Sequence, residues 1–318
     1  MNNRRKFIRQ ICLATGGLTL AGALPSFAFL AEAEAKFDFK ISLSQWSLHK
    51  AFFSKKFDPL DFPVIAIGKY QIEAVEYVNQ FFKDKAEDTN WLKQLKQRCE
   101  DNGVKSVLIM IDGEGPLADK DATVRKKAVE SHYKWVDAAK FLGCHSIRVN
   151  LHGDLTDSEE VWQQASIDGL GKLVEYAAKA DMNVIVENHG GHSCKGKLLM
   201  NIMKQINNKH CGTLPDFGNF CIRREKGDLW ESPCVEWYDR YVGVEEMLPF
   251  AKGVSAKSYD FDAEGNETST DFLKMLKLVK KSAYRGYIAA EYEGNRLSED
   301  EGIRATKKLL EKIRKELA

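Results

Sequence analysis

The chain has 318 residues, of which 44% are hydrophobic and 29% are charged. These fractions are ordinary for a soluble globular protein. The formal net charge is +1 at neutral pH, so the composition carries no basic bias that would indicate nucleic acid as a partner.

The first 35 residues have the pattern of an export signal. Arg4 and Arg5 precede Phe7 and Ile8, an apolar run rich in Gly and Ala follows, and small residues alternate with acids at 31–35. This resembles a twin-arginine signal peptide. We therefore expect residues 1–35 to engage the twin-arginine export machinery and the mature chain to be periplasmic. An uncleaved membrane anchor is the alternative, which the Gly, Thr and Pro residues inside the apolar run disfavour.

Six cysteines follow residue 35, and none forms a CxxC pair, which argues against a zinc knuckle or a thioredoxin-like site. We expect buried free thiols. If the chain is exported to an oxidising compartment, a disulfide could form between Cys221 and Cys234, which flank a single loop.

From residue 37 onward, short apolar runs alternate with amphipathic segments. The apolar runs predict eight strands, at 40–44, 72–78, 104–111, 145–150, 182–187, 212–216, 253–259 and 287–291. The amphipathic segments predict helices at 62–69, 90–102, 120–142, 158–180, 196–207, 244–250, 270–283 and 298–317. The connection 220–243 breaks this rhythm, and its length is typical either of a lid or substrate loop or of a surface excursion.

Eight strands, each followed by a helix, predict a closed (β/α)8 TIM barrel or an open doubly wound sheet. Three strands end in a carboxylate, at Glu187, Asp216 and Glu291, with Glu187 leading into Asn-His-Gly-Gly-His. Acids at the ends of three strands favour the barrel, because its active sites lie at the carboxyl ends of the strands. We expect residues 36–318 to form one such domain.

Three carboxylates on one rim suit a hard or borderline divalent cation such as Mn²⁺, Mg²⁺ or Co²⁺. Glu187 and Glu291 are candidates to remove and return a proton beside a carbonyl, and Lys257 on the seventh strand is a candidate base or oxyanion partner. His189, Arg148 and Trp46 are candidates for substrate binding, while His192 and Tyr292 are further possibilities.

Four motifs resemble the sugar phosphate isomerase/epimerase family, whose members have a xylose isomerase-like TIM barrel. They are Val-Glu187-Asn-His-Gly-Gly, Leu-Pro-Asp216-Phe-Gly-Asn219, Ser255-Ala-Lys257-Ser258-Tyr-Asp-Phe and Ile-Ala-Ala-Glu291-Tyr-Glu-Gly294. The resemblance covers roughly residues 38–315. It implies a divalent metal (Mn, Mg, Co or Zn) held by Glu, Asp, His and Glu at the ends of strands five to eight.

Glu187, Asp216 and Glu291 match three of these ligands, whereas Ser255 stands in place of the histidine. Ser258 replaces an Asp, and Asn219, a further substrate-binding candidate, replaces a histidine of the ketose 3-epimerases. The resemblance implies a sugar isomerase or epimerase that acts on a carbohydrate by metal-assisted proton abstraction. The alternatives are a lyase, hydratase or hydrolase of 3-keto-glycosides, a metal-independent acid–base enzyme and a non-catalytic carbohydrate-binding protein.

Overall fold

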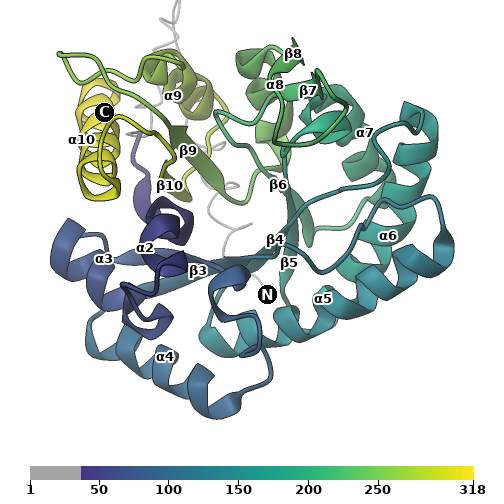
Figure 1. Ribbon diagram of the computed structural model, residues 1–318, viewed down its shortest axis with the longest axis horizontal. Helices are drawn as coiled ribbons and strands as arrows, with labels where there is room; N and C mark the ends of the chain where they lie inside the picture. Colours follow the sequence, from purple (N-terminus) through teal and green to yellow (C-terminus); the bar gives the residue numbers. More distant parts are fainter. Residues whose placement is uncertain (1–36) are drawn as a thin grey trace, which may run out of the picture. The chain divides into compact units, whose positions relative to one another are not determined.

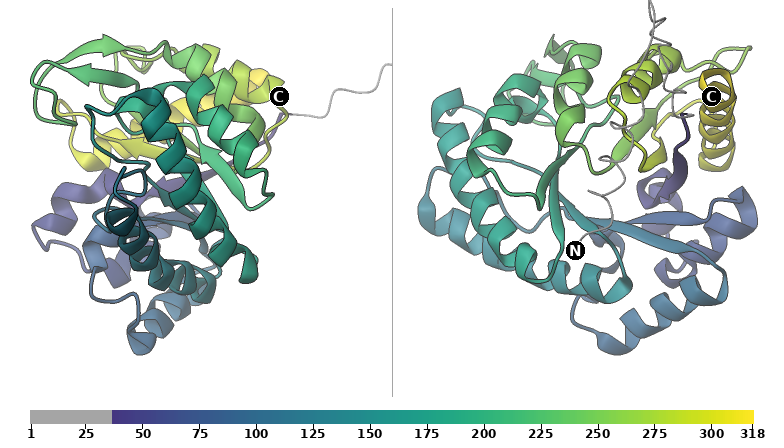
Figure 2. Two further views of the ribbon diagram at one scale, coloured as in Figure 1. Left: turned by 90° about the vertical axis from the view of Figure 1, so that its right-hand side faces the viewer. Right: turned by 180° about the vertical axis from the view of Figure 1, so that it is seen from behind.

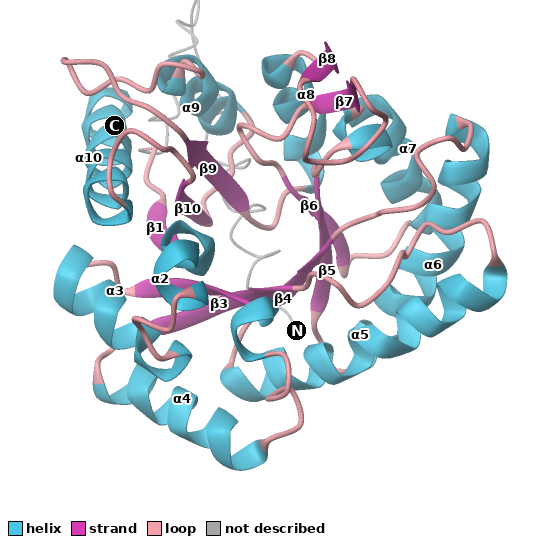
Figure 3. Cartoon of the chain, viewed as in Figure 1, coloured by secondary structure: helices cyan, strands magenta, loops and turns pink. Residues whose placement is uncertain are grey.

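The computed structural model describes residues 37–318, and the predicted export signal lies outside these described residues. Eight parallel strands surround a central axis, and helices cover their outer side (Figures 1 and 3). The strands are β1 (Lys40–Ser44), β2 (Ala74–Val78), β3 (Lys105–Met110), β4 (Ser146–Val149), β5 (Asn183–Glu187), β6 (Cys211–Leu214), β9 (Val254–Ser258) and β10 (Tyr287–Tyr292).

The strand order is β6-β5-β4-β3-β2-β1-β10-β9, which leaves β6 and β9 at the two ends of the sheet. These two ends meet through parallel bridges that join Thr213 to Ala251 and Asp216 to Ser255. Ser255 donates its backbone N–H to the Pro215 carbonyl at 3.0 Å, and its own carbonyl accepts from Phe217 at 3.0 Å. The sheet is therefore closed, as predicted, and is not an open doubly wound sheet.

The helices are α2 (His49–Phe53), α3 (Phe62–Tyr70), α4 (Thr89–Asp101), α5 (Ala122–Leu142), α6 (Glu159–Lys179), α7 (Gly196–Ile206), α8 (Arg240–Met247), α9 (Phe272–Lys281) and α10 (Glu299–Leu317). Their ends follow local chemistry. Ser298 and Glu301 form the predicted capping box of α10, and Gly143 ends α5 at φ 81°. The helix predicted at 244–250 begins earlier, because Asp239 caps the backbone N–H groups of Tyr241 and Val242.

The main hydrophobic core lies between the strands and the helices, and a small second cluster draws on β2, β3, β5 and β6. Met110 of this second cluster also lines the cavity described below. Among residues 37–318, none of the helices has the length and apolar character needed to cross a membrane.

The long connection after β6 contains an antiparallel hairpin, β7 (Cys221–Arg224) and β8 (Cys234–Trp237), which extends beyond the barrel strands in the left view of Figure 2. A disulfide joins Cys221 to Cys234. The expectation of free thiols is wrong for this pair, because hairpin pairing places the two Cα atoms 5.9 Å apart. The remaining cysteines of the described chain, Cys99, Cys144, Cys194 and Cys211, are free and buried, as expected.

Candidate active site

The three strand-end carboxylates of the sequence come together. Glu187 is the last residue of β5, Asp216 follows β6, and Glu291 lies near the end of β10. Each offers an oxygen within 4.8 Å of the others, and all three side chains are buried. We call these three residues the acidic triad.

Two buried cations neutralise part of this charge. The Arg148 Nε lies 2.8 Å from Glu187 Oε2, and its Nη1 lies 2.8 Å from Asp112 Oδ1. On the other side, Lys257 Nζ lies 2.9 Å from Glu291 Oε1 and 2.9 Å from Glu293 Oε2. Arg148 and Lys257 are thus at the site, where each bridges two carboxylates.

Amide side chains fix the ends of β5 and β6. The Asn219 Nδ2 donates to Glu187 Oε1 at 2.9 Å, and the backbone N–H of Asn219 donates to Asp216 Oδ1 at 2.8 Å. Asn188 accepts from the Asp216 N–H at 2.7 Å and donates to the Asp216 carbonyl at 3.0 Å. A Cβ at Gly218 would lie 2.7 Å from the Tyr259 hydroxyl and 2.9 Å from Lys257 Cδ, so any larger residue would displace one of these side chains.

Burial sets the protonation of the site. It raises the pKa of Glu187 to about 8, against the opposing charge of Arg148, and raises the pKa of Asp216 to about 6. Burial acts to lower the pKa of Lys257, but the surrounding carboxylates outweigh it and hold that pKa well above its ordinary value. Burial and then Arg148 lower the pKa of His189, which is therefore neutral.

A cavity of about 720 Å³ opens over the site, and of the acidic triad Glu187 and Glu291 line it whereas Asp216 does not. The sequence-predicted residues on its wall are Trp46, Arg148, Glu187, His189, Asn219, Lys257 and Glu291. Two other candidates point elsewhere: His192 Nε2 lies 3.0 Å from the Asp157 carbonyl, and the buried Tyr292 donates its hydroxyl to the Leu297 carbonyl.

The sequence reasoning missed several wall residues, namely Asp112, His152, Trp230, Tyr259 and Glu293. Two of them carried a readable signal. Asp112 comes directly after the predicted third strand. Glu293 lies two residues after Glu291, so it projects from the same side of an extended chain. The length of the connection that contains Trp230 allowed a substrate loop, but nothing in the sequence pattern singled out Trp230 itself.

The site fits a divalent cation. Asp216 Oδ2 and Ser255 Oγ are buried with no hydrogen-bond partner other than each other in residues 37–318. With all five carboxylates ionised (the triad, Asp112 and Glu293), the site would exceed its three basic side chains (Arg148, Arg224 and Lys257) by two negative charges, which a divalent cation would balance. Carboxylate oxygens are the donors that hard divalent ions prefer.

Comparison with solved structures agrees with the fold. A D-tagatose 3-epimerase-like protein is 19% identical, with a TM-score of 0.65 over 88% of this chain and 100% of that chain. The IOLI protein with a bound zinc atom is 12% identical, with a TM-score of 0.65 over 88% and 99% of the two chains. The 3-keto-D-glucoside 4-epimerase of E. coli is 14% identical, with a TM-score of 0.59 over 86% and 100%.

At the sequence level, the C-glycoside deglycosidase alpha subunit of Arthrobacter globiformis is 36% identical over 63 residues. That match spans 20% of this chain and only 16% of the relative. The family model described as xylose isomerase-like TIM barrel matches residues 66–315. The chain therefore belongs to the xylose isomerase-like TIM barrel family.

Proposed function

We propose that the protein is a sugar isomerase or epimerase that removes and returns a proton beside the carbonyl of a sugar or keto-sugar. The observation that carries this proposal is the acidic triad, buried beside two fixed cations in a cavity large enough for a sugar. Cavities of about 300–1,000 Å³ are typical of small-molecule sites.

Glu187 comes from β5 and Glu291 from β10. On the shorter path round the barrel, two strands, β6 and β9, lie between them. They therefore reach the cavity from different sides, and we assign them the transfer of the proton. Arg148 and Lys257 orient the two carboxylates and offer positive charge to an oxyanion that develops on the substrate. His189 and Trp46 would hold the sugar ring.

Glu187, Asp216 and Glu291, with Ser255 Oγ beside them, would hold a divalent ion. Such an ion polarises a carbonyl and orients neighbouring hydroxyl groups. The similar protein that binds zinc supports a metal in this fold, and the 3-keto-D-glucoside 4-epimerase and the D-tagatose 3-epimerase-like protein support the reaction class.

Elimination or hydrolysis of a 3-keto-glycoside is the second candidate. The local identity to a C-glycoside deglycosidase subunit favours it, and the same proton abstraction begins the reaction. In an elimination, the carbanion formed beside the carbonyl expels the glycosidic substituent and does not regain a proton. The expected export supports a free sugar or glycoside as substrate over a sugar phosphate.

The test is solvent exchange. Candidate sugars and keto-sugars are incubated with the protein in D₂O, and deuterium at the carbon beside the carbonyl is followed by mass spectrometry. The proposal predicts exchange in the wild type that is abolished in Glu291→Gln. Exchange should be preserved in the control Glu264→Gln, which changes an exposed loop position. An isomer of unchanged skeleton indicates an epimerase, whereas a cleaved product indicates the second candidate.

Metal content provides an independent check. Elemental analysis should find a divalent metal in the wild type that is lost in Glu187→Gln and in Asp216→Asn. Sugar binding with neither deuterium exchange nor a cleaved product would refute both enzymatic candidates and leave a carbohydrate-binding protein.

A further inference from the structure

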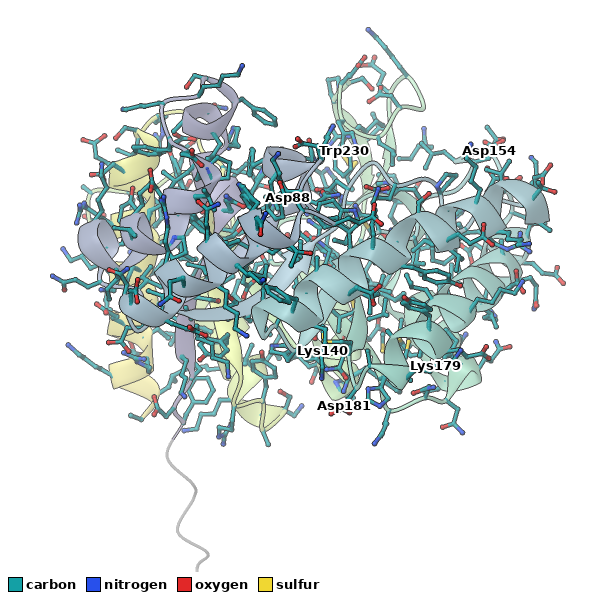
Figure 4. All side chains as sticks on the ribbon, turned by 90° about the horizontal axis from the view of Figure 1, so that it is seen from below. Asp88, Lys140, Asp154, Lys179, Asp181 and Trp230 are labelled. Atoms are coloured by element: carbon teal, nitrogen blue, oxygen red, sulfur yellow. A yellow bond between two sulfur atoms is a disulfide. The ribbon has the colours of Figure 1, made fainter. Side chains whose placement is uncertain are left out.

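The tip of the β7–β8 hairpin, residues 225–233, places an aromatic ring at the mouth of the cavity. Trp230 lines the cavity, yet 47% of its surface remains exposed. Figure 4 shows it at the same end of the barrel as Asp88 and Asp154, away from Lys140 and Asp181. An exposed tryptophan at a cavity mouth offers a flat apolar face to a ligand.

The tip is built to hold this ring in one place. Arg224 donates from Nε to the Leu229 carbonyl at 2.7 Å and from Nη1 to the Ser232 carbonyl at 2.6 Å. Asp228 accepts from the backbone N–H of Ser232 at 3.1 Å. The Cys221–Cys234 disulfide closes the base of the tip.

The inner edge of Trp230 packs on the site itself. Its ring centroid lies 4.4 Å from that of His189 and 6.3 Å from that of His152, which also line the cavity. A Cβ at Gly190 would lie 3.4 Å from Trp230, an ordinary van der Waals distance, so the ring packs directly against the chain that follows His189. The exposed part of Trp230 therefore extends the cavity wall outward, away from the acidic triad.

The cavity of about 720 Å³ is in the range of drug-sized ligands, whereas a monosaccharide is far smaller. We propose that the substrate is a glycoside with at least two rings, one of which carries the carbonyl that the reaction requires. This inference rests on the proposed function. One ring lies over the acidic triad, and the second ring, whether an aromatic aglycone or a second sugar, stacks with its flat face on Trp230.

Binding to the full chain tests this without turnover. Calorimetry would compare methyl β-D-glucoside, which lacks a second ring, with phenyl β-D-glucoside and cellobiose. We expect a two-ring ligand to bind about tenfold more tightly than the methyl glucoside, as one stacked aromatic contact provides. Preference for the phenyl compound marks an aromatic aglycone, and preference for cellobiose marks a second sugar.

The preference should fall to near unity in Trp230→Ala and be largely retained in Trp230→Phe. Trp237→Ala is the matched control, because Trp237 is 55% exposed on the same hairpin and lies outside the cavity wall. Equal affinities in the wild type, no binding of any of the three, or an unchanged preference in Trp230→Ala would overturn the proposal. Deuterium exchange is measured separately, so exchange without a Trp230-dependent preference refutes this inference alone.

Discussion

Glu76 is a buried acid that the proposed reaction does not use, and it should make the stability of the barrel depend on pH. It lies in β2 with 0% of its surface exposed. Ser42 Oγ donates to its Oε1 at 2.6 Å, while its Oε2 has no partner within the described chain. Burial raises the pKa of Glu76 to about 8, against the hydrogen bond from Ser42. The carboxyl is therefore neutral in the folded protein at pH 7.

The ordinary glutamate pKa is 4.5, so the unfolded chain releases this proton far earlier than the native state does. Between these two values the native state binds more protons than the unfolded state, and the free energy of unfolding falls as pH rises. Below pH 4.5 the contribution is fully present, and above about pH 8 its loss is complete. The whole difference corresponds to roughly 5 kcal/mol, of which about 3 kcal/mol is lost between pH 5.5 and pH 9.

Glu76→Gln removes this titration and keeps the shape of the side chain. Urea denaturation of both proteins at pH 5.5, 7 and 9 should show the variant gaining about 3 kcal/mol on the wild type across this range. Glu73→Gln, at an exposed position of the chain just before β2, is the matched control and should follow the wild type. If the Glu76→Gln and wild-type curves run parallel, the carboxyl does not change its charge in this window and the reasoning fails.

Three further predictions concern the disulfide of the hairpin, the close packing of Gly294 against Tyr259, and the export signal. Replacing Cys221 and Cys234 together by serine should cost about 3 kcal/mol in urea denaturation, the effect expected for a bridge across a loop of this length, and titration of both as free thiols in the denatured, unreduced protein would refute a formed disulfide. Gly294→Ala should cost more than about 2 kcal/mol, because its Cβ would collide with the Tyr259 carbonyl, whereas Gly68→Ala in open space within α3 should be neutral or stabilising. Changing the twin arginines to lysines should keep the protein in the cytoplasm on cell fractionation, and unchanged distribution would refute twin-arginine export.

The barrel was predictable because its strands are short, apolar and separated by capped helices. The acids at 187, 216 and 291 were equally readable, since each directly ends an apolar run. The alternating direction of side chains along a strand also predicts which residues near Glu291 face the cavity. Tyr292 lies between Glu291 and Glu293 in extended chain, so it must point away from the side that both acids face. That rule excludes Tyr292 from the cavity and adds Glu293 to it.

The pairing of charges was not predictable in this way. Arg148 meets Asp112 across 36 positions of sequence, and Lys257 meets Glu293 across another 36. Which acid each cation reaches depends on strand register and side-chain direction in the closed barrel. The sequence indicated Cys221 and Cys234 as a possible bridge, but no alternation of polar and apolar residues predicted the hairpin that brings them together. The position of Trp230 at the cavity depends on the same hairpin.

Lys257 should affect both the stability of the protein and its affinity for a metal ion. Its ammonium lies 2.9 Å from oxygens of both Glu291 and Glu293, and its side chain is 3% exposed. Lys257→Met leaves two buried carboxylates without this counter-charge. Removal of one partner from a buried ion pair costs about 3–5 kcal/mol. The metal-free variant should therefore unfold at lower urea concentration than Lys277→Met, a substitution at an exposed position of α9.

The same loss of charge should favour a cation at the acidic triad. With Lys257 gone, the formal excess of negative charge at the site grows by one, and Glu291 is freed from its ammonium. At a given concentration, an ion stabilises the folded state more when it binds that state more tightly. Added Mn²⁺ should thus raise the urea midpoint of Lys257→Met more than that of the wild type or of Lys277→Met. Equal shifts in all three proteins would show that the ion binds away from Glu291, and the assignment of the triad as its ligands would be wrong.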